Sequence, residues 1–277
     1  MSKSDRVVLV LGGAGTVGSG IVKALLDKGF KAAVISRDGG RLEKLRAFVS
    51  PSSKDNLIAV VGDVGSEDGA QQAKQQLLQH VGKVTDVVSA LGFSWWQGGP
   101  PHTQTLQDLH WVSTHTPSCS FPSLMSLMSP LSPAVLMRPA CCSLQVLDAL
   151  LFSTFVSWKT FFPLVRDDPS CSYTFITGGA GEQLLMPGTG FLTVGAASAL
   201  AFCQVLRDEY PQVDCRLCQV KINTGVATPE RLGPGYLNHL DLGVAVATLV
   251  ERGSSSHCVF TIGSPADLQT QLLDGNL

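Results

Sequence analysis

The sequence predicts an α/β protein: a single doubly wound domain with a mostly parallel sheet and helices on both faces. Three observations support this. Short apolar runs rich in Val and Ile recur along the chain, segments with helical spacing of apolar residues separate them, and the first run leads into a glycine-rich turn. We expect one domain over residues 1–277, because this length suits one large α/β domain.

The composition argues against two classes of protein. Hydrophobic residues make up 44% of the chain and charged residues 15%, against roughly 25% charged residues in an average soluble protein. The mean hydropathy is +0.21, yet Gly, Pro, Ser or Lys interrupts every long apolar run before about 18 residues, which argues against a membrane protein. The net charge is −2 without a basic run, so we expect neither nucleic acid nor a membrane surface as a partner.

The first residues and the cysteines favour a cytoplasmic protein. Met1–Arg6 is short and polar, and Val7–Leu11 is already of strand type, so we expect no targeting segment. Cys215 and Cys218 have the spacing of a redox or zinc half-site. They fall in a predicted strand, where residues three apart face opposite sides, so we interpret them as buried structural thiols and expect no metal.

The first strand and its turn have the pattern of a phosphate-binding site. Val7–Leu11 is followed by glycines at positions 12, 15 and 18 and by a helical segment that ends at Lys28-Gly29. The first glycine permits a tight turn, the second lets the backbone approach a pyrophosphate, and the third lets the helix pack on the strand. The pattern indicates a Rossmann domain with a phosphate-binding turn formed by Gly12, Gly15, Thr16, Val17 and Gly18.

The second predicted strand, Ala32–Ile35, ends at Ser36 and Arg37. A carboxylate at this point would bind the ribose 2′-hydroxyl of NAD, whereas a hydroxyl and a guanidinium suit a 2′-phosphate. We therefore predict NADP(H) rather than NAD(H); the alternative is that Arg37 is an ordinary surface residue. The next strands are predicted at Leu57–Val61 and Thr85–Ser89.

Motifs after these strands resemble those of a known family. Asp63-Val64 is similar to its adenine-contacting Asp-Val pair, and Ser89–Gly92 stands where it has Asn-Asn-Ala-Gly. Lys221–Thr228 is similar to its Pro-Gly-x-x-x-Thr loop, which holds the nicotinamide amide. With its glycine spacing, the sequence resembles the short-chain dehydrogenases/reductases. Together with the strand ends, the resemblance implies further cofactor contacts at Ser36, Arg37, Asp63, Val64, Ala90, Leu91, Gly92, Thr224 and Gly225.

The acid–base residues of that family are missing. The family uses a tyrosine to pass the proton, a lysine four residues later, a carbonyl-polarising serine and an asparagine. Carried over one by one, the asparagine falls on Leu150, the serine on Gly178 beside Thr177, and the tyrosine and lysine on Thr193 and Ala197 or on Phe191 and Gly195. A lysine four residues later follows none of the three tyrosines, which are Tyr173, Tyr210 and Tyr236.

Three hypotheses about function follow. In the first, the protein is an NADP(H)-dependent oxidoreductase that transfers hydride to or from a small carbonyl, alcohol or enone without Ser-Tyr-Lys, because hydride transfer is the cofactor's chemistry. In the second, it is a catalytically silent NADP(H)-binding sensor or partner protein. In the third, the gene product is nonfunctional. We favour the first, with Thr177 and Thr193 as candidates for the proton donor.

Val112–Gln145 interrupts the predicted fold. These 34 residues hold eight serines, five prolines and one charge, Arg138, and have neither helical nor strand periodicity. Joining Trp111 to Val146 restores a continuous helix start like that of the family. Because both edges can be encoded by splice-site sequences, we interpret residues 112–145 as a disordered insertion that is a translated intron. The alternative is a genuine lineage-specific loop, and sequencing the transcript distinguishes the two.

Two features bear on the substrate. Trp95-Trp96 follows the fourth strand at the carboxyl edge, where doubly wound sheets bind ligands, and predicts an apolar or aromatic small-molecule substrate. The alternative is a packed loop. Glu182 follows the fifth strand, either as a carboxylate near the nicotinamide or, as we favour, as a surface residue.

The remaining helices bear on assembly. Those predicted over Leu147–Val165 and Thr193–Leu206 are apolar nearly all round and must be covered on more than one face. The corresponding pair forms a dimer interface in relatives, so the resemblance implies a homo-oligomer; packing within one core is the alternative. A last helix and strand are predicted over Leu242–Val250 and Cys258–Ile262.

Overall fold

The computed structural model describes residues 2–92, 147–253 and 256–273. Trp95, Trp96 and residues 112–145 lie outside the described residues. An aromatic substrate contact and a disordered insertion therefore stay predictions.

The described residues form a central sheet of seven parallel strands in the order β3-β2-β1-β4-β5-β6-β9. The strand order reverses between β1 and β4, as in a doubly wound Rossmann sheet, and this confirms the predicted fold class. Two short strands, β7 and β8, pair separately. The strands are β1 (Val7–Leu11), β2 (Lys31–Ser36), β3 (Leu57–Val61), β4 (Asp86–Ser89), β5 (Ser172–Gly178), β6 (Arg216–Ile222), β7 (Val226–Ala227), β8 (Leu237–Asn238) and β9 (Val259–Ile262).

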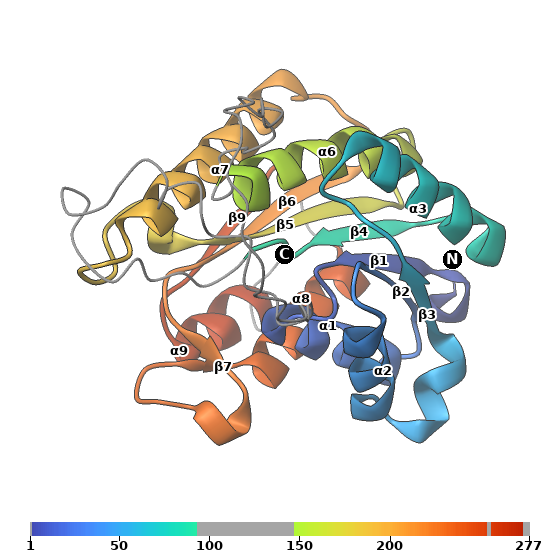
Figure 1. Ribbon diagram of the computed structural model, residues 1–277, viewed down its shortest axis with the longest axis horizontal. Coiled ribbons are helices and arrows are strands. Elements are labelled where there is room, and N and C mark those ends of the chain that lie inside the picture. Colours follow the sequence, from blue (N-terminus) through green and yellow to red (C-terminus); the bar gives the residue numbers. More distant parts are fainter. Residues whose placement is uncertain (1, 93–146, 254–255, 274–277) are drawn as a thin grey trace, which may run out of the picture.

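Helices cover both faces of the sheet (Figure 1): α1, α2 and α8 lie on one face, and α3, α6 and α7 on the other. The α-helices are α1 (Thr16–Asp27), α2 (Gly39–Phe48), α3 (Glu67–Val81), α6 (Ser153–Phe161), α7 (Gly190–Glu209), α8 (His239–Arg252) and α9 (Pro265–Asp267). Short 3-10 helices lie at Lys3–Asp5, Pro51–Asn56, Phe162–Leu164, Gly179–Gly181 and Pro229–Arg231, and π-helical turns at Asp148–Phe152 and Leu268–Leu273.

The central strands are apolar because both of their faces are covered. All five residues of β1 are buried. Val8 and Val10 join the core beneath α1 and α8, whereas Leu9 and Leu11 join the core beneath α3, α6 and α7. The strand alternation therefore supplies two separate cores, one on each face of the sheet.

Helices α1 and α8 cross at two glycines. A Cβ on Gly20 of α1 would collide with the carbonyl oxygen of His239, and a Cβ on Gly243 of α8 would collide with that of Gly20. Only residues without a side chain let the two backbones approach this closely. The contact holds α8 against the helix that follows the phosphate-binding turn.

A buried ionic network closes the amino edge of the sheet. The Asp86 carboxylate is fully buried and accepts hydrogen bonds from Arg6 Nε (3.1 Å) and Nη2 (2.7 Å). The hydroxyls of Thr85 and Ser172 donate to it at 2.8 and 2.6 Å. We call these four residues the amino-edge network. Its donors satisfy the buried charge, which would otherwise be strongly destabilising.

Helix α7 is long and apolar enough to cross a membrane by length and composition alone, and 28% of its most apolar 18 residues are buried. The core helix of a soluble protein passes the same test. Here α7 packs against β5 and the 3-10 helix that follows it, and Cys203 and Leu206 enter the core. Its remaining apolar residues, Val194 and Val205 among them, lie on an exposed face.

The cysteines in the described residues are free thiols, and four of them are buried. Cys215 lies directly before β6 and Cys218 within it, and both are buried, as the sequence predicts. Burial raises the pKa of Cys203 and of Cys215 to about 12 and that of Cys171 to about 11. At neutral pH these thiols are therefore protonated and poorly nucleophilic.

Candidate functional site

The glycine-rich turn after β1 is built by close backbone contacts. Gly12 has a φ of +75°, and a Cβ there would collide with the carbonyl oxygen of Ala90 at the end of β4. A Cβ on Gly18 would collide with the carbonyl oxygen of Gly12. The turn therefore fits between β1, β4 and α1 only if both positions are glycine.

The N-terminus of α1 opens onto this turn. Gly15 is the N-cap residue and provides no side chain to cap the helix. The first backbone hydrogen bond of the helix runs from Ser19 N to Gly15 O (2.8 Å), which leaves the amides of Thr16, Val17 and Gly18 at the helix end. Such amides, with the positive end of the helix dipole, bind phosphate groups.

The ends of β2 and β3 lie side by side. Gly62 N donates to Ser36 O at 3.0 Å, and Arg37 Nε lies 3.8 Å from the Asp63 carboxylate. The Arg37 side chain is 77% exposed, so its guanidinium is open to a ligand. Asp63 also accepts the amide of Gly65 at 2.9 Å. The Asp63 carboxylate is thus held in its loop, while Arg37 is only loosely paired.

Two further loops complete the carboxyl edge. Ala90 and Leu91 leave β4 beside the glycine turn and pack on the two cores, whereas Gly92 is exposed. Thr224 and Gly225 leave β6 and lead into β7, which lies against α1. The predicted cofactor residues therefore meet along one edge of the sheet; Val64, half-buried after β3, packs on the core.

Thr177, near the end of β5, has its hydroxyl engaged by the core. Gln219 of β6 donates its amide Nε2 to Thr177 Oγ1 at 2.9 Å, and Arg207 of α7 donates to the other end of the same amide. Gln219 is buried. Thr177 thus serves as an acceptor for a buried side chain, and this is a structural explanation for its presence.

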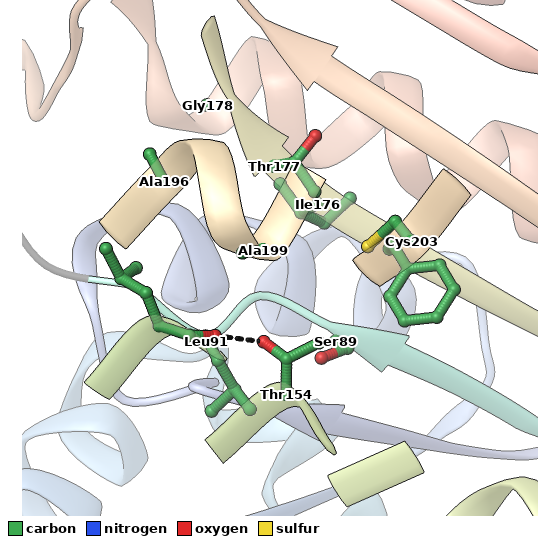
Figure 2. A pocket seen from close by; sticks show the side chains of 11 residues that line it. Ser89, Leu91, Thr154, Ile176, Thr177, Gly178, Ala196, Ala199 and Cys203 are labelled. Carbon is green, nitrogen blue, oxygen red and sulfur yellow. Dashed lines mark hydrogen bonds between the residues drawn. The ribbon is translucent and has the colours of Figure 1, made fainter. Parts of the chain in front are cut away.

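A narrow cavity of about 40 Å³ lies between β4, β5, α6 and α7. Figure 2 shows Leu91 and Thr154 on one side of it and Ala196, Ala199 and Cys203, all from α7, on the other. Thr154 donates its hydroxyl to Leu150 O rather than into the cavity. The space is sufficient for a very small number of water molecules and too small for a substrate.

The positions that correspond to the family's catalytic residues are apolar or structural. Leu150 is buried and packs with Ala180 and Ala196, and Phe191 packs against this cluster. Gly195 is buried within α7. Thr193 donates its hydroxyl to Thr189 O, one turn back in the helix, at 3.3 Å. Thr177 and Thr193 therefore both have other hydrogen-bond partners.

Sequence reasoning missed a charged group at the ends of β5 and β6. Lys221 Nζ lies 2.6 Å from Glu182 Oε1, and Asn223 Nδ2 donates to Glu182 Oε2 at 3.4 Å. The hydrogen bond from Lys221 lowers the pKa of Glu182 below its ordinary value. The Glu182 side chain is 45% exposed, in agreement with the surface location that we favoured.

The architecture of this edge fits a dinucleotide. The glycine turn, the uncapped helix N-terminus and the exposed Arg37 all lie at the carboxyl edge of the sheet, next to the point where the strand order reverses between β1 and β4. Doubly wound sheets bind their ligands at the carboxyl ends of their strands, at this reversal.

The sequence model of the short chain dehydrogenases matches residues 6–136. Over these residues the chain is similar to the short-chain dehydrogenase/reductase family. The family uses the Rossmann fold, in agreement with the sheet order and the glycine turn described above.

Similar proteins of this family cover part of the chain. A cis-2,3-dihydrobiphenyl-2,3-diol dehydrogenase of Paraburkholderia xenovorans is 29% identical over 92 residues, which are 33% of this chain and 32% of the relative. A human 3-oxoacyl-[acyl-carrier-protein] reductase is 32% identical over 90 residues, which are 32% of this chain and 36% of the relative. The match thus spans about a third of the length of these curated relatives.

Similar structures cover nearly all of the fold. An alcohol dehydrogenase from the archaeon Thermococcus sibiricus, complexed with 5-hydroxy-NADP, superposes with a TM-score of 0.69 at 16% sequence identity. The superposition covers 94% of this chain and 97% of that one. At this level of identity the likeness supports the fold alone.

Proposed function

We propose that the protein is an NADP(H)-dependent oxidoreductase of the short-chain dehydrogenase/reductase type that transfers hydride to or from a small carbonyl, alcohol or enone substrate. The observation that carries the proposal is the phosphate-binding cradle. Gly12 and Gly18 tolerate no Cβ, and the amides at the N-terminus of α1 have no capping side chain. Backbone amides placed in this way suit the phosphates of a dinucleotide.

The preference for NADP(H) rests on Arg37. Its guanidinium is largely exposed at the end of β2, where it can pair with a 2′-phosphate, and its present partner, Asp63, is 3.8 Å away. An exposed ion pair at this distance is weak, so a dianionic phosphate can displace it. The hydroxyl of Ser36, the neighbouring residue, lies at the same strand end, where it donates to Asp38 O at 3.4 Å and accepts from Asp38 N at 3.2 Å.

The chemistry divides between cofactor and protein. NADP(H), when bound, supplies or accepts the hydride. The glycine turn and the N-terminus of α1 would hold the phosphates, and Thr224 and Gly225 would hold the nicotinamide end. The positions that correspond to the usual Ser-Tyr-Lys residues hold no serine, tyrosine or lysine, so the proton must come from another group at this edge.

The test is cofactor binding followed by turnover. Titration with NADPH and NADH, monitored by nicotinamide fluorescence, should give tighter binding of NADPH by about tenfold or more, and Arg37→Ala should remove this difference. Replacing Arg41, a second exposed arginine nearby on α2, by alanine is the matched control. Equal affinity for both cofactors in the unaltered protein contradicts the NADP(H) preference.

Turnover is measured with the same protein. NADPH oxidation is followed at 340 nm with a panel of apolar ketones, aldehydes and enones that includes 9,10-phenanthrenequinone. Oxidation that depends on the carbonyl supports the oxidoreductase.

A silent NADP(H)-binding sensor is the second candidate. Leu150 stands at the position of the family's asparagine, and Thr193 with Ala197, or Phe191 with Gly195, stands at those of its tyrosine and lysine. The lack of the family's catalytic side chains favours this candidate. Tight NADPH binding without oxidation by any member of the panel would establish the sensor and overturn the oxidoreductase.

We also propose a homodimer formed through α6 and α7. Phe155 on α6 and Val194 and Val205 on α7 are large apolar side chains that are 42%, 56% and 48% exposed. A second copy of the chain would cover them. Light scattering after size exclusion should give a dimer that Val205→Asp dissociates, whereas Val61→Asp, at the end of β3, should leave it intact. A monomeric unaltered protein contradicts this proposal.

The substrate and the location of the protein are proposals of the same kind. An apolar or aromatic substrate suits the exposed Leu184, Leu185 and Met186, which lie between β5 and α7 at the carboxyl edge. Free thiols at Cys171, Cys203, Cys215, Cys218 and Cys258 suit the reducing cytoplasm. Imaging of a tagged full-length protein tests the location, and a secretory or organellar distribution contradicts it.

A further inference from the structure

The chain has three tyrosines, and they lie in very different surroundings. Tyr173 is fully buried in β5, and burial raises the pKa of its hydroxyl far above the ordinary value. Tyr210 ends α7 and packs against Phe162 and Trp158, with ring centroids 5.3 and 5.6 Å away. Tyr236 is 47% exposed and lies on the segment that leads into β8.

The phenol end of Tyr236 covers the backbone of Gly225. A Cβ on Gly225 would lie 2.7 Å from Cζ, the ring carbon that carries the hydroxyl, and 2.8 Å from Cε1 and Cε2. The ring therefore occupies the space that a side chain at position 225 would need. Within the part of the chain that the structure describes, no hydrogen bond engages the Tyr236 hydroxyl.

The segment that carries Tyr236 is fixed to the loop after β6. Leu237 N donates to Gly225 O at 2.8 Å, and the Thr224 hydroxyl donates to Gly235 O at 2.8 Å. The pairing of β7 with β8 continues this attachment, with Val226 opposite Leu237. The phenol is thus held at a defined position on the loop.

This loop lies at the same edge of the sheet as the proposed cofactor site. It leaves the carboxyl end of β6, and β7 lies against α1, the helix whose N-terminus forms the phosphate site (Figure 1). In doubly wound sheets this is the edge where ligands bind.

We propose that Tyr236 donates the proton in carbonyl reduction at this site. The proposal rests on the proposed oxidoreductase function. The carbonyl carbon gains a hydride with its electron pair from the reduced nicotinamide, the carbonyl oxygen takes the phenolic proton, and solvent water returns a proton to the phenolate. A hydroxyl acid placed in this way contributes about 10²- to 10⁴-fold to a rate.

The first experiment uses nitration and does not depend on turnover. Tetranitromethane modifies exposed tyrosines, and peptide mass spectrometry gives separate rates for Tyr236 and Tyr210. Saturating NADP⁺ should slow nitration of Tyr236 at least fivefold, whereas 2′,5′-ADP, which has the 2′-phosphate but no nicotinamide, should change it less than twofold. Tyr210, which caps the C-terminus of α7, is the internal control. It should react at the same rate in all samples.

Two results overturn the proposal here. One is equal nitration of Tyr236 with and without NADP⁺. The other is no nitration of Tyr236 in the free protein, because the phenol would then not be open to a ligand.

The second experiment measures the rate of 9,10-phenanthrenequinone reduction by NADPH. Tyr236→Phe keeps the ring on Gly225 and removes the hydroxyl, so kcat should fall about 100-fold while the Kd for NADPH stays within twofold. Tyr210→Phe is the matched control and should leave both unchanged. An active unaltered protein whose Tyr236→Phe variant keeps kcat within threefold overturns the role of Tyr236 alone. An unaltered protein that binds NADPH but reduces no carbonyl overturns the proposed function itself, whatever the nitration result.

Discussion

The two edges of the central sheet differ in whether their polar groups have hydrogen-bond partners within the protein. At the amino edge, the buried Asp86 carboxylate meets two nitrogens of Arg6 and two hydroxyls. At the carboxyl edge, the N-terminus of α1 has no capping side chain, and Arg37 is exposed beside a distant partner. The first edge satisfies its own polar groups and contributes to stability, whereas the second leaves donors free for a ligand. Substitutions at the two edges should therefore separate stability from binding.

Asp86→Asn should produce the largest change. It leaves the Arg6 guanidinium, whose side chain is only 11% exposed, without a countercharge. Breaking a buried pair in this way lowers the free energy of unfolding by about 3–5 kcal/mol. Urea unfolding measures this, with the exposed Asp68→Asn as a control that should shift it by less than about 0.5 kcal/mol. A loss below about 1 kcal/mol for Asp86→Asn would mean that the network adds little to stability.

Gly18→Ala should affect binding most. The new methyl group collides with Gly12 O and deforms the phosphate-binding turn, so the Kd for NADPH should rise about 100-fold, or about 2.7 kcal/mol. Gly39→Ala in α2 is the control, since the nearest atom to its Cβ is 3.9 Å away and the affinity should not change. Isothermal titration gives both constants. If the folded Gly18→Ala variant bound NADPH with unchanged affinity, the glycine turn would not be the phosphate-binding site.

Thr177→Val tests whether a hydroxyl at the carboxyl edge is structural. It deprives the buried Gln219 amide of its acceptor, so the free energy of unfolding should fall by about 1–2 kcal/mol while kcat changes less than threefold. Thr193→Val should cost less, because its hydroxyl bonds only to a helix carbonyl already in reach. A large loss of kcat with unchanged stability would instead make Thr177 a proton donor.

The smallest effect should come from His239, at the crossing of α1 and α8. Burial lowers its pKa below 6.5, and its Nδ1 is buried without a hydrogen-bond partner among the described residues. The unfolded chain therefore binds a proton near pH 6.5 that the folded protein does not, so stability is complete above this pH and falls as the pH drops below it. The free energy of unfolding, measured between pH 8 and pH 5, should decline less steeply in His239→Gln than in the unaltered protein. In the control variant His80→Gln it should decline as in the unaltered protein. A stability profile of His239→Gln identical to that of the unaltered protein would exclude this contribution.

Local patterns predicted most of the fold. Strands β1 and β3 were predicted at their exact bounds, β4 and β9 differ by one residue at one end, and β2 extends one residue further at both ends. Runs rich in β-branched residues that are bounded by Gly, Lys or Asp are a local signal. Helix α7 begins three residues before and ends three residues after its predicted span, and α8 also extends beyond its own. Helix ends depend on capping and packing, which a periodic pattern does not contain.

The long-range contacts could not be predicted in this way. Arg6 and Asp86 are 80 residues apart, and Lys221 meets Glu182 across 39 residues. Neither pair has a spacing that signals contact, because only the strand order brings them together. The same holds for Tyr236, whose position over Gly225 depends on the pairing of β7 with β8. The candidate cofactor residues could be predicted from the sequence because they lie at, or within a few residues after, the carboxyl end of a strand.

The crossing of α1 and α8 at Gly20 and Gly243 has a consequence for mutational scans. Every substitution at either position adds atoms where two backbones already touch, so both positions should tolerate as little change as Gly12. In a growth-based scan they would be indistinguishable from residues that bind the nucleotide. A parallel scan of protein abundance would separate the two groups. Variants of Gly20 and Gly243 should have a low abundance in the cell because they fail to fold, whatever their affinity for the nucleotide.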